Sequence, residues 1–438
     1  MEVLEKERTL ITERSFEESE NYLRRAEGLI PAYTQTLSKG PTQFVRGHSP
    51  IYLARGEGSH VFDVDGNEYI DYPLGLGPVT LGHNYPAVTE AMERQMHDGL
   101  TYSLMHPMEV ELAEMLCEII PCCDSVRYSK TGSEVTSAAI RIARAYNGRE
   151  IVASQGYHGW HEWYAVTTER DHGIPKVMKN YIETFNYNDI DNLKAIFEKH
   201  PDNVSCVIIE PVSVEEPTDN FLEQVRELCD HYKAVLIFDE IVTGFRIALG
   251  GAQEYYGITP DLATFGKGMA NGMPLSVVVG KKEIMSACEK AFFSTTFGGE
   301  VLSMVACSAT IREMKKKNVI DHLWRMGKKL QDGYNDLTDK YSIPSKCIGL
   351  APHNAFTFTD ESGEVSYPLK SLFLRETIKR GVLFSGVQNF CFSHTVEDIE
   401  NTLRAVEESF EFISEILKTG RLESEIGDKV IRPVFRNL

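Results

Sequence analysis

A short apolar run ends in two carboxylates at Val235–Ile241, which reads Val-Leu-Ile-Phe-Asp-Glu-Ile. Runs of this kind, without an internal polar residue, are typical of strands that are buried on both faces of a parallel sheet. Ligands gather at the carboxyl ends of such strands, so Asp239 lies where a binding site is expected. An aspartate at a strand end can equally serve as a cap, and taken alone that structural role is the commoner one.

The next apolar run leads to a lysine between two glycines. Residues 263–272 read Ala-Thr-Phe-Gly-Lys-Gly-Met-Ala-Asn-Gly. An amine held in this way is suited to form a Schiff base, and Asp239 would pair with the protonated ring nitrogen of a cofactor. Considered singly, Lys267 would be interpreted as a loop lysine on the surface. The hypothesis therefore depends on whether the chain supplies the other parts of such a site.

A phosphate cup is one of those parts. Residues 129–134 read Ser-Lys-Thr-Gly-Ser-Glu at a predicted turn from strand to helix. Backbone N–H groups at a helix N-terminus, together with the hydroxyls of Thr131 and Ser133, are suited to bind phosphate. The same spacing fits an ordinary capping box from Thr131 to Glu134, and without further context we favour that interpretation.

Aromatic and hydroxyl side chains supply further candidates. Tyr157 lies in a glycine-bracketed loop, where its ring could stack on a planar group, although a buried aromatic turn is the commoner case. Ile241 would point the same way as Asp239 and pack on a ring face. The segment around Thr296 offers a second hydroxyl-rich phosphate contact. The spacing of the histidines that follow Tyr157 does not predict a metal site.

Short apolar strands alternate with helices through the middle of the chain. The pattern predicts strands over residues 125–128, 150–154, 204–209, 234–238 and 276–279, and helices over 107–120, 220–232 and a segment that reaches Ala145. This alternation indicates an α/β fold, in which helices cover a mostly parallel sheet.

The N-terminal part has a different pattern. Residues 16–30 predict an amphipathic helix that Pro31 ends. Alternating runs on either side of Asp65-Gly66-Asn67 predict a β-hairpin.

The C-terminal part is rich in helix signals, which end in a long amphipathic helix over residues 396–417. We expect an arm and hairpin at residues 1–75, a large cofactor-binding domain at 76–310 and a smaller α+β domain at 311–438. The charged tail from Thr419 would either wrap a neighbour or be mobile.

Composition limits the classes of partner. The 438 residues carry a net charge of −19, which argues against nucleic acid and anionic membranes as main partners. The N-terminus lacks the apolar segment of a signal peptide, and no stretch is long enough to span a bilayer. The nine cysteines show neither a disulfide framework nor metal-ligand spacing. We expect a cytoplasmic protein with reduced thiols and no metal.

Each of these signals is weak alone, but their order along the chain resembles the class III (subgroup II) aminotransferases of fold type I, which depend on pyridoxal 5'-phosphate. Within that class the chain is most similar to the glutamate-1-semialdehyde 2,1-aminomutase group. The resemblance covers nearly the whole chain and rests on Asp63–Tyr72, Gly82-His83, Phe238–Arg246, Pro260–Leu262 before Gly266-Lys267, and Ser393–Thr395 with Glu397–Ile399.

The resemblance implies a role for each candidate. Gly132 and Ser133, with Thr131 beside them, would hold the phosphate, and Tyr157 would stack on the ring. Asp239 would bind the ring nitrogen and Ile241 would pack against the ring. Lys267 would carry the cofactor and serve as general base and acid. Thr296 would reach the cofactor of a neighbouring subunit, which implies a homodimer with shared sites.

The chain departs from the aminomutase pattern at residues that would contact substrate. Arg46 is kept, but it follows Gln43-Phe44-Val45 where the group has Ser-Pro-Val. Asparagines of the group are replaced by Lys130 and Glu215, and Gln388 lies in a segment that lacks the group's glutamate.

These departures favour an aminotransferase over an aminomutase. It would transfer an amino group from an amino acid, with glutamate as the leading donor, to an aldehyde or ketone, and the cofactor would alternate with pyridoxamine 5'-phosphate. The polar side chains Lys130, Gln388 and Asn389, at positions where a more apolar lining is usual, suggest a sugar-like acceptor. Alternatives are the aminomutase itself, a decarboxylase or racemase that uses the same cofactor, and a non-catalytic relative that binds the cofactor without turnover.

Overall fold

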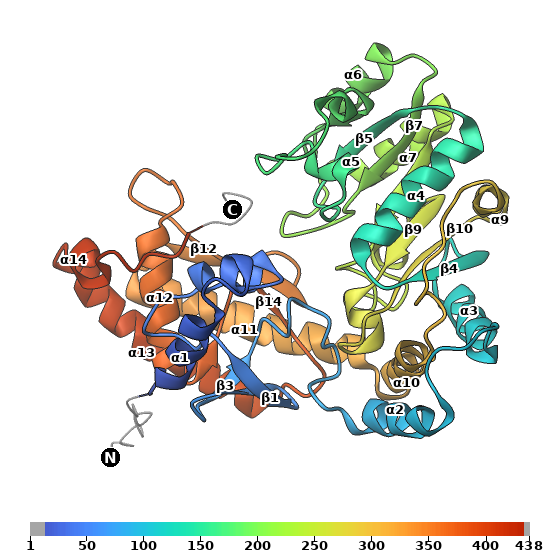
Figure 1. The fold of residues 1–438 in the computed structure, drawn as a ribbon. Coiled ribbons are helices and arrows are strands. Elements are labelled where there is room, and N and C mark those ends of the chain that lie inside the picture. The colour runs from blue at the N-terminus through green and yellow to red at the C-terminus, as the bar shows by residue number, and fades with distance from the viewer. Residues whose placement is uncertain (1–13, 433–438) are drawn as a thin grey trace. The chain divides into compact units, whose positions relative to one another are not determined.

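The computed structural model describes residues 14–432 and divides the chain into two compact units (Figure 1). The central unit comprises Gly77–Leu81 and Tyr85–Leu323. The split unit takes residues up to Leu76, Gly82–Asn84, and those from Trp324 onward.

A seven-stranded sheet forms the core of the central unit. Its strands lie in the order β4 (Ser125–Ser129), β10 (Ser276–Gly280), β9 (Leu262–Phe265), β8 (Val235–Asp239), β7 (Val204–Ile209), β5 (Ile151–Gln155) and β6 (Ile182–Thr184). Only β10 runs antiparallel to its neighbours. The predicted α/β class and mostly parallel sheet are therefore confirmed. Strands β6 and β9 were not predicted because three or four residues carry too little periodicity.

Helices and short 3-10 turns connect these strands. They are α2 (Pro86–Asp98), α3 (Pro107–Ile119), α4 (Gly132–Asn147), α5 (Glu162–Ala165), η4 (Lys176–Tyr181), α6 (Ile190–Lys199), α7 (Phe221–Tyr232), α8 (Ala252–Tyr256), η5 (Lys267–Ala270), α9 (Lys282–Met285), η6 (Ser286–Glu289) and α10 (Val301–Lys317). Helix α4 packs on the sheet through Val135, Ala139 and Ile142, which are buried in one cluster with Ile208 and Val278. This packing fixes the N-terminus of α4 beside the ends of the strands.

The split unit contains two small sheets. One has the order β1 (Leu53–Glu57), β2 (His60–Asp63), β3 (Glu68–Asp71) and β13 (Val382–Leu383), and the other has the order β11 (Ser345–Ile348), β12 (His353–Phe358) and β14 (Val387–Asn389). The antiparallel pair β2–β3 confirms the predicted hairpin. Strand β13 pairs in parallel with β3, with Val382 opposite Ile70. Segments from both ends of the chain thus share one sheet.

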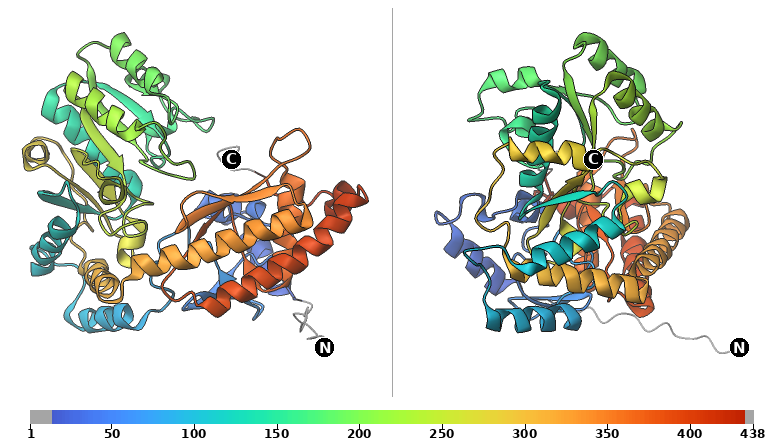
Figure 2. Two further views of the ribbon diagram at one scale, coloured as in Figure 1. Left: turned by 180° about the vertical axis from the view of Figure 1, so that it is seen from behind. Right: turned by 90° about the vertical axis from the view of Figure 1, so that its right-hand side faces the viewer.

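Its helices are α1 (Glu17–Ala26), η1 (Pro31–Tyr33), η2 (Leu37–Lys39), η3 (Pro41–Gln43), most of α11 (Val319–Tyr341), α12 (Tyr367–Lys379), α13 (Val396–Lys418) and α14 (Leu422–Ile426). Helices α11 and α13 lie side by side (Figure 2), and the ion pair of Lys329 with Glu400 at 2.6 Å joins them. Helix α13 confirms the predicted C-terminal helix. Helix α1 ends at Ala26, four residues before the predicted end, because Glu27 leaves the helical conformation.

The tail from Thr419 is ordered as far as it is described. It forms α14, and Ile426 and Ile431 are buried. The N–H of Arg432 donates to the Thr42 carbonyl at 3.1 Å, so this part of the tail packs on the unit that contains the N-terminal arm. Residues 433–438 of the predicted tail lie outside the described residues.

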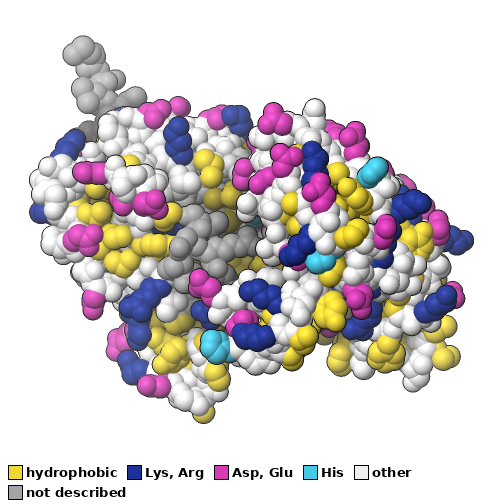
Figure 3. Space-filling model, turned by 90° about the horizontal axis from the view of Figure 1, so that it is seen from above, with side chains coloured by type: hydrophobic (Ala, Val, Ile, Leu, Met, Phe, Trp, Pro, Cys, Tyr) yellow, Lys and Arg dark blue, Asp and Glu magenta, His cyan; other side chains and the backbone are white. Residues whose placement is uncertain are grey.

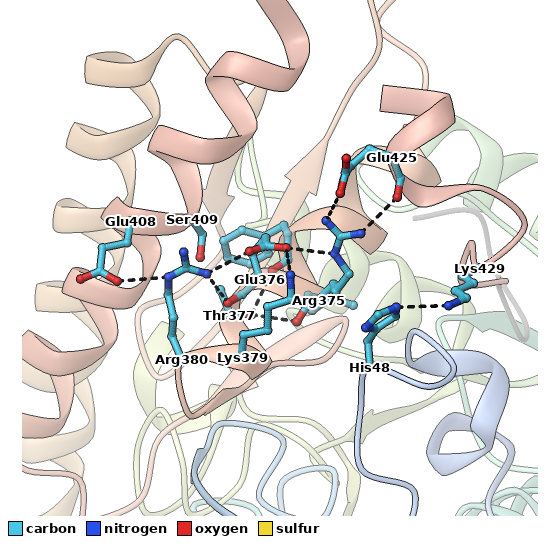
Figure 4. A network of polar contacts seen from close by, with 12 residues as sticks. His48, Arg375, Glu376, Thr377, Lys379, Arg380, Glu408, Ser409, Glu425 and Lys429 are labelled. Atoms are coloured by element: carbon cyan, nitrogen blue, oxygen red, sulfur yellow. Dashed lines mark hydrogen bonds and ion pairs between the residues drawn. The ribbon is translucent and has the colours of Figure 1, made fainter. Parts of the chain in front are cut away.

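A cluster of ion pairs holds α12, α13 and α14 together (Figure 4). Glu376 is buried and accepts hydrogen bonds from Arg375, Lys379 and Arg380 at 2.6–3.0 Å. Arg375 also reaches Glu425 on α14, and Arg380 reaches Glu408 on α13. Burial alone would raise the pKa of Glu376, but its cationic partners outweigh that effect and lower it. The cluster therefore keeps the carboxylate charged inside the split unit.

Acidic and basic side chains are interspersed on the face of the molecule that Figure 3 shows. None of the helices within residues 14–432 is long and apolar enough to cross a membrane.

Candidate active site

A pocket of about 300 Å³ lies in the central unit, where β8 and β9 end and α4 begins. Seven of the residues predicted from the sequence line it: Lys130, Gly132, Ser133, Tyr157, Asp239, Ile241 and Lys267. They come from separate segments between residues 130 and 267 of the chain. The fold therefore brings most of the predicted site together.

The carboxylate of Asp239 is buried and held on both oxygens. Its Oδ1 accepts hydrogen bonds from the hydroxyl of Thr264 at 3.1 Å and from the N–H of Ile241 at 3.2 Å. Its Oδ2 lies 2.7 Å from Nδ1 of His158. Neutral donors and one imidazole thus fix the orientation of this carboxylate at the end of β8.

His158 is fully buried, and the hydrogen-bond partner of its second ring nitrogen shows where one of its protons lies. Nε2 lies 2.8 Å from the carbonyl oxygen of Gln155, which can only accept a hydrogen bond, so Nε2 carries a hydrogen. A further proton must lie between Nδ1 and the Oδ2 of Asp239 to make that contact a hydrogen bond. The pair of His158 and Asp239 is therefore neutral as a whole, with that proton held between the two side chains.

Lys267 opens η5 with an unusual backbone conformation. Its φ of 39° lies in the left-handed region, which is costly for a residue with a Cβ and is characteristic of functional sites. Burial lowers the pKa of its amine, so the neutral, nucleophilic form is more populated near neutral pH than for an exposed lysine. The hydroxyl of Thr80 donates to the carbonyl of Gly268 at 3.0 Å and helps to hold this turn.

The N-terminus of α4 forms another wall of the pocket. Glu134 accepts a hydrogen bond from the N–H of the N-cap Thr131 at 2.8 Å, as a capping box requires, and one from the N–H of Lys130 at 3.0 Å. Both interpretations of this segment are compatible, because the cap orients the helix while Gly132 and Ser133 face the pocket. A Cβ at Gly132 would lie 3.4 Å from Ile241, which is an ordinary van der Waals distance, so Ile241 borders the start of α4.

The loop after β5 carries Tyr157 to the pocket. The N–H of Tyr157 donates to the carboxylate of Glu210 at 2.8 Å, and its ring is partly exposed. A Cβ at Gly156 would lie 2.6 Å from the same carboxylate, and one at Gly159 would lie 2.1 Å from the Ser133 hydroxyl. Both glycines have positive φ, so the loop requires glycine at these positions. The glycine bracket around Tyr157 thus allows a close approach to β7 and α4.

The other predicted residues do not line this pocket. Thr131 is the N-cap of α4, and its carbonyl accepts from Ser276. Thr296 is exposed on the segment before α10, and Glu215 accepts a hydrogen bond from Asn188. Lys130 does line the pocket, but its amine pairs with Glu300 at 2.8 Å.

Arg46 and Gln388 belong to the split unit. Arg46 pairs with Glu20 at 3.0 Å. Gln388 is fully buried on β14, and neither its amide oxygen nor its nitrogen has a hydrogen-bond partner among the described residues.

Sequence reasoning missed two residues that the structure places in the site. They are His158, for which the sequence predicts no role, and Glu210, which directly follows β7. The sequence signal for these two residues was their position. His158 follows Tyr157 in the glycine-bracketed loop, and Glu210 directly follows β7, the strand next to β8. Their contacts with Asp239 and Tyr157 depend on the pairing order of the sheet, which periodicity does not give.

The chain is similar to known sequences of the family that its motifs resemble. The sequence model of the family Aminotransferase class-III matches residues 44–417. A 3-aminobutyryl-CoA aminotransferase of Cloacimonas acidaminovorans is 36% identical over 409 residues, which cover 91% of this chain and 98% of that protein. A glutamate-1-semialdehyde 2,1-aminomutase of Persephonella marina is 35% identical, with 83% of this chain and 92% of that protein covered.

Solved structures of related proteins have the same fold. The FumI protein of Sphingopyxis sp. MTA144, solved as its PLP internal aldimine form, superposes with a TM-score of 0.85 at 26% identity. The match covers 92% of this chain and 97% of that one.

Proposed function

The chain belongs to the class III aminotransferase family, and from that premise we propose that it is a pyridoxal-phosphate-dependent aminotransferase. It transfers an amino group from an amino acid, with glutamate as the leading donor, to an aldehyde or ketone. The observation that carries this proposal is a lysine with a lowered pKa in one pocket with a buried, oriented aspartate.

The residues of the pocket fit the cofactor. Asp239 offers a buried carboxylate to a protonated ring nitrogen, and the His158 contact keeps that carboxylate in place. The first N–H groups of α4 at Gly132 and Ser133 offer donors and a favourable dipole to a phosphate. Tyr157 and Ile241 provide flat and apolar surfaces for the ring. A volume of about 300 Å³ lies at the lower end of the range for small-molecule sites.

Bound pyridoxal phosphate supplies an electron sink for the negative charge that develops on the substrate Cα. The chain's own residues supply the proton chemistry. The Lys267 amine is neutral more often than an exposed lysine, so it could accept the proton from the substrate Cα and deliver it across the imine nitrogen to the carbon that comes from the cofactor's aldehyde. Glu210 positions the backbone of Tyr157.

Lys267→Ala tests the assignment. The purified protein should bind pyridoxal phosphate and show a visible absorbance band that shifts when glutamate is added. Lys267→Ala should abolish turnover, whereas Lys282→Ala, at an exposed position of the central unit, should not change it. A protein that binds no pyridoxal phosphate would overturn the proposal.

The acceptor is proposed as a sugar-like or other polar carbonyl compound, on the basis of Lys130, which lines the pocket, and of the polar Gln388 and Asn389 in the sequence. A β-keto thioester is a second candidate because of the 36% identity with the 3-aminobutyryl-CoA aminotransferase. A screen of donors and acceptors by mass spectrometry decides between them.

The aminomutase remains an alternative because of the 35% identity with the Persephonella marina enzyme. If the protein converts glutamate semialdehyde to aminolevulinate with no second donor present, the aminotransferase proposal fails.

We also propose a homodimer. The central unit exposes several large apolar side chains in two segments, namely Leu104, Met105, Phe292 and Phe297. Apolar groups of this size are typical of surfaces that a partner covers. Thr296 lies in the second segment and would reach the partner's cofactor. If light scattering gives the mass of a single chain, the homodimer proposal fails.

A further inference from the structure

Two cysteine side chains touch each other in the central unit, where the end of α3 leads into β4. The Sγ atoms of Cys117 and Cys123 lie 2.9 Å apart, and both thiols are free. A disulfide requires a distance of about 2.05 Å, so the two sulfur atoms need to approach by only about 0.9 Å to form one. The cofactor chemistry described above uses neither of them.

The backbone between the two cysteines holds them in contact. Cys117 lies in the last turn of α3, and the N–H of Cys123 donates to the carbonyl of Ile120 at 3.0 Å, which closes a turn directly after the helix. The N–H of Asp124 then donates to the carbonyl of Gly280 on β10 at 3.1 Å and fixes the start of β4. The contact between the thiols therefore follows from the hydrogen bonds that end the helix and begin the strand.

The two thiols differ in their exposure. All nine cysteines lie within the described residues, and of these only Cys117 and Cys288 are not buried. A small oxidant in solution therefore reaches Cys117 before Cys123. Burial raises the pKa of the Cys123 thiol, so this group keeps its proton near neutral pH. This difference suits a pair in which one thiol meets the oxidant and the other reacts with the product.

Other partners for Cys117 fit less well. Within residues 14–432, no group of three or more His, Cys, Asp or Glu side chains is arranged to hold a metal ion, so the pair lacks the further ligands of a zinc site. Cys122 is buried, and its N–H donates to the amide oxygen of Gln253 at 3.0 Å. The thiol in contact with Cys117 is that of Cys123.

We propose that Cys117 and Cys123 form a site of reversible oxidation, at which a peroxide converts the two thiols to a disulfide. The Cys117 sulfur attacks one oxygen of hydrogen peroxide, the O–O bond breaks, and the other oxygen leaves as water with the thiol proton, which gives a sulfenic acid. The Cys123 sulfur then attacks the sulfenic sulfur, the S–S bond forms and the S–O bond breaks. The departing hydroxide takes the Cys123 proton and leaves as a second water.

Two electrons pass from the two thiols to the peroxide in this sequence, and a thiol reductant reverses it. The disulfide thus protects the exposed thiol from the irreversible sulfinic and sulfonic acids. The inference does not rest on the proposed function, because no residue of the cofactor pocket takes part.

Peptide mapping of the cofactor-loaded protein tests this. The protein is treated with hydrogen peroxide at a dose that oxidises most of the Cys288 thiols, the remaining thiols are alkylated, and the chain is digested without reduction. Fragment spectra should show a link between Cys117 and Cys123 with a mass lower by two hydrogen atoms, and dithiothreitol should remove it. Cys288 is the internal control, because it is partly exposed but touches no other sulfur atom among the described residues, so it should proceed to the sulfinic acid.

Serine variants distinguish the two neighbouring buried thiols. Cys123→Ser should abolish the link and raise the sulfinic form of Cys117 at least about tenfold, because no second thiol traps the sulfenic acid. Cys122→Ser, at the adjacent buried position, should leave the link unchanged. If Cys123→Ser does not fold, the position of the link in the wild type still decides.

The proposal fails if Cys117 and Cys123 both remain available for alkylation when Cys288 is oxidised. It also fails if Cys117 is linked to Cys122 or to a second chain, or if Cys122→Ser loses the link as fully as Cys123→Ser.

Discussion

Asp239 and His158 form a buried pair at which a single substitution changes the charge of the pocket. Their contact of 2.7 Å holds one proton between a carboxylate and an imidazole that has no access to solvent. Without the imidazole, the carboxylate keeps only the neutral donors Thr264 and Ile241. The energetic cost then depends on whether another cation is present.

His158→Leu should therefore destabilise the cofactor-free protein more than the cofactor-loaded one. Loss of one partner of a buried ion pair costs about 3–5 kcal/mol, and a bound protonated ring nitrogen would offset part of it. Melting temperatures with and without pyridoxal phosphate measure the difference. His172→Leu, at an exposed site of the same unit, is the control. An equal loss in both forms would show that Asp239 does not face the ring nitrogen.

At the scale of single residues, the sequence predicted those site residues whose roles follow from local patterns. Lys267, Asp239 and Tyr157 could be named because a glycine-flanked lysine, a strand-end aspartate and a glycine-bracketed aromatic are local patterns. His158 and Glu210 could not, since their roles arise from contacts between segments. The partners of Lys130 and Arg46 were not predicted either, because Glu300 and Glu20 are distant in sequence and an ion pair between distant segments leaves no local pattern.

Among the elements, the loop between β5 and α5 depends on its contact with α4. The N–H of Trp160 donates to the hydroxyl of Ser133 at 3.2 Å, so the loop and the proposed phosphate cup are tied together. Gly159 makes this contact possible because it leaves no side chain between them.

Gly159→Ala should weaken the binding of pyridoxal phosphate as well as stability. Gly173→Ala is a matched control, because both glycines have positive φ but a Cβ at Gly173 would meet nothing within 4 Å. The control should lose about 1–2 kcal/mol of unfolding free energy through backbone strain alone. Gly159→Ala should lose more, and titration of the cofactor into the apoprotein should show a higher Kd only for this variant. Equal cofactor affinities would contradict the proposed role of Ser133.

The carboxylate of Asp398, in the first turn of helix α13, accepts hydrogen bonds from several partners. Asp398 accepts hydrogen bonds from the N–H of Thr395 and the hydroxyl of Ser59, and it lies 3.1 Å from His60. Burial would raise the pKa of Asp398, but these hydrogen bonds outweigh it and lower the pKa. The hydrogen bond with Asp398 raises the pKa of His60 above 6.5.

This contact should make stability depend on pH. Because folding raises the pKa of His60, its contribution is fully present below about pH 6.5 and is lost as the pH rises through the folded-state pKa. The unfolding free energy of the wild type should exceed that of His60→Gln by up to about 1 kcal/mol at pH 6, and by less at pH 9. Urea unfolding at both values measures it, with His172→Gln as the control. A gap that widens with pH would have the wrong sign.

For the whole molecule, the sequence predicted the fold class because short, mostly apolar strands alternate with amphipathic helices in the central unit. The antiparallel direction of β10 was not predicted, since direction leaves no trace in periodicity. In the split unit, the pairing of β13 with β3 was equally hidden, because two residues are too short for a strand signal.

The ion cluster on α12 should stabilise the split unit as a whole. Glu376→Ala removes the carboxylate that Arg375, Lys379 and Arg380 share, and breaking a buried pair costs about 3–5 kcal/mol. Glu411→Ala, at an exposed position of α13, should cost less than about 1 kcal/mol. Denaturant unfolding of both variants measures the difference, and equal losses would mean that the arginines find other partners.

The parallel pairing of β13 with β3 has a consequence for biosynthesis. The ribosome makes β3 early and β13 near the end of the chain, so the edge of β3 stays without its neighbour during most of synthesis. The strands of the central unit are complete once Gly280 has been made. A chain that stops early after Leu323 would thus contain every strand of the large sheet but retain an open strand edge, which invites aggregation or degradation. Only a nearly finished polypeptide contains β13 and can cover the edge of β3. Incomplete chains therefore keep an exposed strand edge, which favours their removal.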